Sequence, residues 1–328
     1  GWDETFTTQT DYATILDGNA AGSVVTQPTD FTTLTVWSNF TIQNGKTTAT
    51  SGDNGGAGVW LCKKGQVKHC RIINNVSANY GGGVGNNSAA ASDVLIDDCI
   101  IKDNIAKQGG GARIRGTIQN SQIINNSTSS SNTGGVYLQY GRILNCIVKG
   151  NVSNENTGGV RAYGACYVVN CLIANNKALG SAGNNGQIGG LSWENGGAAL
   201  IINNTIVNNE QTSSGNEARC GLRCAAASAD AILANNVIWG HKAAGSVIGT
   251  QCQGTDKTIF TGENAILNNA VYNAAIGVNG IKLAADDVLF TDIEKEDFTL
   301  VDGCKLIDAG ADAYAQGKVD LAGNARIQ

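Results

Sequence analysis

The chain has 328 residues, of which 15% are charged, and a net charge of −5. One Pro among 44 Gly excludes collagen, no apolar run approaches the roughly 18 residues of a membrane helix, and the acidic balance argues against broad nucleic-acid binding. Gly, Asn and β-branched residues are poor helix formers, while 42% of the residues are hydrophobic, so we expect an ordered all-β protein with many turns.

In chain order, the sequence divides into entry coils (1–52), repeat coils (53–280) and a closing segment (281–328), which together form one domain over 1–328. One block recurs along the chain: an apolar residue, a spacer, Asn or a substitute, a marker residue, a variable residue, Ile or Val, and an Asn-rich end. The marker is the fourth residue of each block. Its nine copies, spaced 22–33 residues apart, are Phe40, Cys70, Cys99, Ser121, Cys146, Cys171, Asn204, Asn236 and Asn269.

Two slots of the block are apolar in every copy. They lie three residues before and two residues after the marker, as Ile143 and Val148 do around Cys146. In one continuous strand the first slot and the marker would lie on opposite faces, so we expect a bend at the residue just before the marker. Asn suits this bend because it tolerates left-handed backbone. That residue is Asn in most copies and His69 or Asp98 in two.

Each copy should therefore contain a strand, an Asn bend, a second strand, an Asn/Gly turn and a surface loop such as residues 127–133 or 179–188. A Gly pair followed by an apolar residue precedes most copies, as in Gly82–Gly83–Val84 and Gly134–Gly135–Val136, and predicts a third strand. Three short strands per repeat predict a parallel β-coil whose equal slots stack about 4.8 Å apart. The markers would then form an interior column, and the bend residues a ladder of amide hydrogen bonds. The Asn of this ladder are Asn39, Asn120, Asn145, Asn170, Asn203 and Asn235.

The outward slot of the Gly-pair strand is the best candidate for a functional surface. Aromatic rings stack on sugar faces and guanidinium groups bind carboxylate or sulfate, so a strip of both suits a glycan. The alternative is that Arg and Tyr only keep a flat sheet soluble. Coil by coil the slot reads Trp60, Gly85, Arg113, Tyr137, Arg161, Ser192 and Arg223, with Arg115, Tyr140, Tyr163 and Glu194 on the same side. The predicted substrate-binding residues are Trp60, Arg113, Tyr137, Arg161, Tyr163 and Arg223.

The repeats resemble right-handed parallel β-helix proteins of the pectate-lyase-like superfamily. They are more similar still to exported repeat proteins of unknown function from gut Bacteroidetes, which carry GGG(I/V) and NCxIxxN motifs. Gly81–Gly82–Gly83–Val84 and Asn145–Cys146–Ile147–Val148 carry this resemblance, although Ala325 stands where the family usually has Pro. The resemblance implies a single-stranded right-handed β-helix of nine or more coils. It also implies an extracellular or cell-surface location, associated with the outer membrane of a Gram-negative bacterium.

The resemblance also offers a catalytic alternative, because lyases of that superfamily use an Arg or Lys base beside Ca²⁺ held by carboxylates. Arg113, Arg161 and Arg223 are the candidate bases, yet Glu194 is the only carboxylate in the strip. We therefore assign no catalytic residue and no metal ligand. Two acidic groups stand elsewhere. The group expected to cover a turn is Asp93, Asp97, Asp98 and Asp103, and the group with room for a loop cation is Asp286, Asp287, Asp292 and Asp297.

Ten Cys are too few for a disulfide scaffold of this length, and those in the marker column should be buried and reduced. The better candidates for any disulfide are the pairs Cys220–Cys224 and Cys252–Cys304. With no CxxC pair and only two His, the sequence predicts no zinc site.

These observations leave three functional hypotheses. The first is a non-catalytic, exported surface protein that binds complex carbohydrate. The second is a polysaccharide lyase or glycoside hydrolase acting on an acidic glycan. The third is a structural adhesin or a component of an outer-membrane assembly, with an outer-membrane protein as partner. We expect a monomer that binds a polysaccharide or cell-surface glycan, no nucleic acid, and no cofactor, with Ca²⁺ as the alternative.

Overall fold

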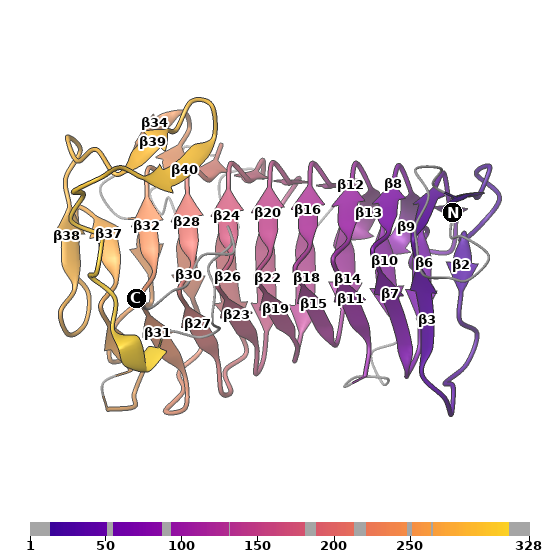
Figure 1. Ribbon diagram of the computed structural model, residues 1–328, viewed down its shortest axis with the longest axis horizontal. Helices are drawn as coiled ribbons and strands as arrows, with labels where there is room; N and C mark the ends of the chain where they lie inside the picture. The colour runs from indigo at the N-terminus through magenta and orange to yellow at the C-terminus, as the bar shows by residue number, and fades with distance from the viewer. Residues whose placement is uncertain are drawn as a thin grey trace.

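Each sequence repeat forms one turn of a parallel β-solenoid, as the period predicts (Figure 1). The solenoid has about eight turns, where nine or more were expected. The computed structural model describes residues 14–50, 55–86, 93–130, 132–180, 188–212, 221–247, 251–263 and 265–314. Four sheets run along the rod, numbered here in their order within one turn, starting from the Gly-pair strand. The amino-terminal strands lie at the right of Figure 1 and the carboxy-terminal strands at the left.

Sheet 1 holds the Gly-pair strands and sheet 2 the strands before the Asn bend. Sheet 1 consists of β2 (Val25–Thr26), β6 (Val59–Leu61), β10 (Val84–Asn86), β14 (Ala112–Ile114), β18 (Val136–Gln139), β22 (Val160–Tyr163), β26 (Leu191–Glu194), β30 (Leu222–Cys224) and β35 (Cys252–Gln253). Sheet 2 consists of β3 (Thr35–Ser38), β7 (Gly65–Lys68), β11 (Leu95–Asp97), β15 (Thr117–Gln119), β19 (Arg142–Leu144), β23 (Tyr167–Val169), β27 (Leu200–Ile202), β31 (Ile232–Ala234) and β36 (Ile266–Leu267).

Sheet 3 holds the strands after the Asn bend, and sheet 4 the short strands that follow. Sheet 3 consists of β1 (Thr14–Asp17), β4 (Phe40–Gln43), β8 (Arg71–Ile73), β12 (Ile100–Lys102), β16 (Gln122–Ile124), β20 (Ile147–Lys149), β24 (Leu172–Ala174), β28 (Thr205–Val207), β32 (Val237–Trp239), β37 (Ala270–Tyr272) and β38 (Ile281–Leu283). Sheet 4 consists of β5 (Lys46–Thr47), β9 (Val76–Tyr80), β13 (Ile105–Gln108), β17 (Ser127–Thr128), β21 (Val152–Ser153), β25 (Lys177–Ala178), β29 (Glu210–Gln211), β33 (Lys242–Ala243) and an antiparallel end strand, β34 (Ser246–Val247).

The fourth sheet corrects the prediction of three strands per turn. Its strands are mostly two residues long and lie where the sequence predicts only a surface loop, so that residues 127–133 begin with β17. A two-residue strand is too short to show an alternating pattern of apolar and polar residues, which is why the sequence does not reveal it.

Equal slots of successive repeats stack directly on one another, as predicted. Val148 pairs with Ile173 across β20 and β24, and both side chains are fully buried. The markers from Cys70 to Asn269 are likewise buried and form the interior column. The bend is also confirmed, because the residue before every marker has positive φ, for example 53° at Asn145 and 50° at Asp98.

A second, fully buried ladder lies five residues after the markers, and the sequence analysis did not identify it. Its rungs are Asn75, Asn104, Asn126, Asn151, Asn176, Asn209 and His241. At each Asn rung before Asn209, the side-chain Nδ2 donates to the Oδ1 of the next rung and to a backbone carbonyl of the preceding turn. Asn151, for instance, donates to Asn176 and to the Ile123 carbonyl, both at 2.9 Å. We call this the inner ladder, and the bend residues the outer ladder.

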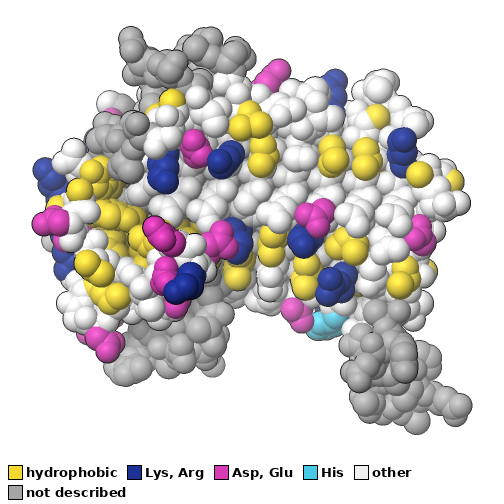
Figure 2. Space-filling model, turned by 90° about the horizontal axis from the view of Figure 1, so that it is seen from above, with side chains coloured by type: hydrophobic (Ala, Val, Ile, Leu, Met, Phe, Trp, Pro, Cys, Tyr) yellow, Lys and Arg dark blue, Asp and Glu magenta, His cyan; other side chains and the backbone are white. Residues whose placement is uncertain are grey.

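The closing segment adds β38 to sheet 3, and the described residues after it pack against the outside of the rod. The hairpin of β39 (Phe290–Asp292) and β40 (Asp297–Leu300) contributes to an apolar cluster that includes Trp239 on sheet 3. Figure 2 shows the apolar side chains gathered at this end of the molecule. A short 3₁₀ helix (Asp312–Tyr314) follows, and the Tyr314 carbonyl accepts a hydrogen bond from Asn203 of the outer ladder.

The cysteines of the interior column are free thiols. Burial raises the pKa of Cys146 and Cys166, which keeps both thiols protonated and unreactive. Cys252 and Cys304 are also free, so the candidate disulfide between them does not form, whereas Cys220 of the other candidate pair lies outside the described residues.

Candidate functional site

The predicted strip is a continuous row on the outer side of sheet 1. Register pairs Trp60 with Gly85, then Arg113, Tyr137, Arg161, Ser192 and Arg223 in successive strands. The Gly pairs let neighbouring turns approach: a Cβ on Gly111 would lie 2.8 Å from the Gly135 carbonyl oxygen and from Ile123 Cγ2.

Arg and Tyr side chains in this row stack on one another along the rod axis. The Arg113 guanidinium carbon lies 3.8 Å from the Tyr80 ring centroid and 5.9 Å from that of Tyr137. Arg161 lies on the other side of Tyr137, 5.1 Å from its centroid. The exposed fraction is only 7% for Tyr137 and 8% for Trp60. The ring faces of Tyr137 are thus occupied by arginines, which leaves guanidinium N–H groups as the main contact chemistry of the strip.

The charge of the strip is positive although the chain is acidic. Arg161 donates to Glu194 Oε2 from Nη2 at 2.6 Å and from Nε at 3.1 Å, and Arg223 Nη1 approaches Glu194 Oε1 at 3.4 Å. Among the described strands of sheet 1, the charged residues are Arg113, Arg161, Arg223 and Glu194. These strands therefore carry three guanidinium groups and one carboxylate, which contacts Arg161 and Arg223.

Of the remaining predicted residues, Tyr163 borders the row and Trp60 forms its amino-terminal end. Tyr163 makes edge-on contacts with Tyr137 and Tyr140, with ring centroids 6.4 and 6.1 Å apart. Trp60 lines a separate hollow near the amino-terminal end, of about 400 Å³, together with Lys46. The ion pairs to Glu194 engage Arg161 and Arg223 as proton donors, whereas a general base has to accept a proton. The described residues contain no group of three or more His, Cys, Asp or Glu placed to hold a metal ion.

The acidic clusters have structural partners. Asp98 lies at a bend and pairs with His69 at 2.8 Å, and Asp97 accepts a hydrogen bond from Asn120. In the closing segment, Asp292 pairs with Lys295 at 2.7 Å, and Asp287 pairs with Lys305. In the first cluster, Asp98 therefore lies at the bend between β11 and β12, next to Asp97 at the end of β11.

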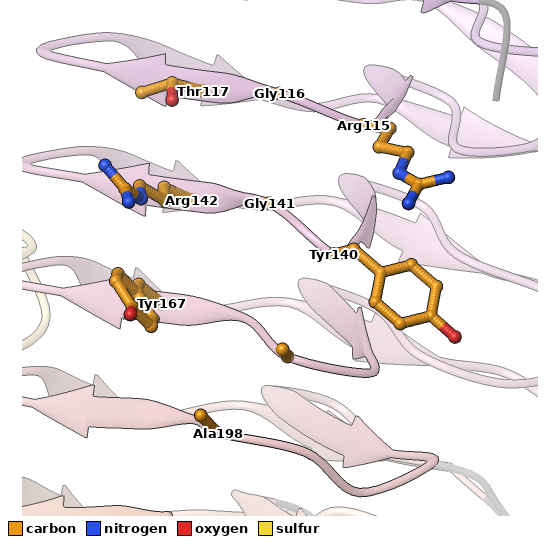
Figure 3. A pocket seen from close by; sticks show the side chains of 9 residues that line it. Arg115, Gly116, Thr117, Tyr140, Gly141, Arg142, Tyr167 and Ala198 are labelled. Carbon is orange, nitrogen blue, oxygen red and sulfur yellow. The ribbon is translucent and has the colours of Figure 1, made fainter. Parts of the chain in front are cut away.

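The sequence analysis missed a hollow on the outside of the rod, at the turn from sheet 1 to sheet 2. This corner trough has a volume of about 320 Å³ and is walled by Arg115 and Tyr140 on one side and Arg142 and Tyr167 on the other, with Gly116 and Gly141 between them (Figure 3). Each Arg stacks on the Tyr of the next turn, 5.0 Å from its ring centroid. A signal was present: Arg142 and Tyr167 both occupy the slot four residues before a marker.

No helix in the described part of the chain is long and apolar enough to cross a membrane. No protein-family model, curated protein or solved structure matches the chain, so the functional argument depends on this geometry.

Proposed function

We propose that the protein binds an acidic polysaccharide, without transforming it, along sheet 1 and the adjoining corner. The observation that carries this proposal is the excess of guanidinium groups on one rigid face of a chain whose net charge is −5. Guanidinium groups bind carboxylate and sulfate through paired N–H donors, which favours anionic over neutral sugars.

The spacing of the charges supports a regular polymer as ligand. Arg113, Arg161 and Arg223 occupy every second strand of sheet 1, which places their backbones roughly 9.6 Å apart, or two strand spacings. A polysaccharide with an anionic group at a regular interval can therefore contact several arginines at once. Because the β-solenoid fixes the backbone, little conformational entropy is lost on binding.

The motif resemblance supports placing this activity at the bacterial cell surface or in the medium. We propose, as parts of the same function, that the protein is bacterial, is exported and acts as a monomer.

Charge substitutions on sheet 1 test the proposal. Glu194→Gln removes the carboxylate that competes for Arg161 and Arg223, so its affinity for carboxymethyl dextran should rise about fivefold, or about 1 kcal/mol. The double variant Arg113→Gln, Arg223→Gln should bind at least tenfold more weakly. Isothermal titration calorimetry at low and high salt measures both, since screening weakens such contacts.

Arg71→Gln is the matched control, because it removes an exposed Arg from sheet 3. It should bind like the wild-type protein, and unmodified dextran should bind weakly to every variant. Equal binding of charged and neutral dextran would contradict the proposal. Release of unsaturated oligosaccharides from an acidic polysaccharide would contradict its non-catalytic part.

A further inference from the structure

We infer that the sugar chain itself binds in the corner trough, and that Arg115 and Arg142 bind its carboxylate or sulfate groups from the two walls. This inference rests on the proposed function and names the site at which the ligand's backbone lies.

The trough is more accessible than the strip on sheet 1. Tyr140 is 46% exposed and Arg142 is exposed, whereas the strip's Tyr137 is 7% exposed. In the strip, side chains of successive turns fill the space above the strands. In the trough, by contrast, the floor between the two walls is bare (Figure 3).

The floor is bare because the backbone leaves no room for larger residues. A Cβ on Gly141 would lie 2.4 Å from the Gly116 carbonyl oxygen, so this position requires glycine. In the next two turns the floor continues as Ala165 and Ala198, both exposed. The floor thus spans four turns, roughly 14 Å along the rod axis at the usual strand spacing. A hollow of this length, parallel to the axis, fits a short stretch of a linear polymer.

The walls favour an anionic polymer. Each wall holds one guanidinium group whose plane is positioned by stacking on a tyrosine, Arg115 on Tyr140 and Arg142 on Tyr167. Arg142 is exposed, and stacking of this kind orients its guanidinium group so that two N–H groups can donate to the oxygens of a carboxylate or sulfate. Among the residues that the structure describes, those lining the trough include no carboxylate that would repel such a ligand. The phenol of Tyr140 also accepts a hydrogen bond from Asn195 at 3.2 Å, which helps to fix that wall.

Matched oligosaccharides and variants test this inference. The probes are short oligomers of carboxymethyl dextran, dextran sulfate and dextran, which share one sugar backbone and differ in their substituents. Arg142→Gln should weaken binding of the anionic oligomers about tenfold. Ala165→Trp should weaken it as much without any change in charge, because the indole would fill the floor.

Two controls separate these effects from general ones. Arg71→Gln removes an exposed Arg on sheet 3, and Ala285→Trp adds an indole at an exposed position of the closing segment. Both should bind like the wild-type protein, and the melting temperatures of all four variants should confirm that they fold.

The outcomes distinguish the inference from the proposed function. If the trough variants bind normally while Arg113→Gln, Arg223→Gln loses affinity, the ligand lies on the strip and the inference is wrong. If no anionic oligomer binds the wild-type protein, the proposed function fails together with it. Preference for carboxymethyl dextran or for dextran sulfate identifies which substituent the two arginines hold.

Discussion

His241 is the last rung of the inner ladder and the only one that is not Asn. Its Nδ1 accepts a hydrogen bond from the Asn209 backbone N–H at 3.0 Å, while its Nε2 is buried without a hydrogen-bond partner. Burial lowers the pKa of His241 from 6.5 to about 3, because the charged imidazolium would lose its hydration. A neutral histidine therefore ends the ladder at all moderate pH values.

This pKa predicts a loss of stability in weak acid. Between pH 6.5 and about 3 the unfolded chain binds a proton at His241 that the folded chain does not. The free energy of unfolding therefore decreases by about 1.4 kcal/mol for each pH unit by which the solution is acidified in this window. His241→Asn removes this contribution, and its amide is placed to donate to the Ile206 carbonyl as the other rungs do. The free energy of urea unfolding should therefore fall less from pH 7 to pH 5 in the variant, by about 2 kcal/mol.

The free energies of unfolding of the two proteins at pH 7 serve as the reference for this difference. An unchanged acid sensitivity in His241→Asn would show that other groups cause it.

At the scale of the element, the two ladders of one turn should differ sharply in their contribution to stability. Asn151 is fully buried, and its Oδ1 accepts from both the backbone N–H and the side chain of Asn126. Asn151→Ala would leave these buried donors unpaired, so it should reduce the free energy of unfolding by about 3 kcal/mol or more. Asn145, six residues earlier, is exposed and needs positive φ. Asn145→Gly keeps that conformation and should cost less than about 1 kcal/mol. Equal losses in chemical denaturation would contradict the assigned roles.

The ladders also show how far the sequence predicts the elements. The outer ladder was predicted because alternation fails between Ile143 and Cys146, which requires a bend. The inner ladder was equally regular in sequence but was missed, since Asn near a strand end is usually explained by the turn it makes. In this fold the turn is made by the residue before, such as Asn175 with φ of 55°, and the amide of Asn176 points inward. An Asn that makes a bend and an Asn whose amide is buried in the inner ladder can be told apart only in the folded solenoid, where the buried amide has a hydrogen-bonding neighbour in the coil above and in the coil below.

At the scale of the whole molecule, the period predicts which residues share a column but not what fills the space between columns. The row from Trp60 to Arg223 was predicted correctly as a strip. The sequence did not predict that Arg side chains would stack on the Tyr rings and cover their faces, because stacking depends on side-chain rotamers that the strand register does not determine. The corner trough was missed for a related reason: it lies between two columns, and its walls come from the turn after sheet 1 and from sheet 2. The packing of the closing hairpin on sheet 3 could not be predicted either, because the hairpin is not part of the repeat and its sequence does not indicate which strands it contacts.

The closing hairpin leads to a prediction about how the rod opens. In a solenoid each turn contacts only its neighbours, so a change at one end should act locally. Phe290 is 4% exposed and packs edge-on against Phe298, with centroids 5.7 Å apart. Phe290→Ala should destabilise the hairpin by about 3 kcal/mol and release it from the cluster around Trp239. Hydrogen exchange should then accelerate in β38, β39 and β40, while β16 and β20 keep the protection of the wild-type protein.

Val288→Ala is the matched control in the same segment, because Val288 is 70% exposed, and it should leave exchange unchanged. Uniform acceleration along the rod would show instead that the turns unfold as one cooperative unit and that the hairpin holds the whole solenoid.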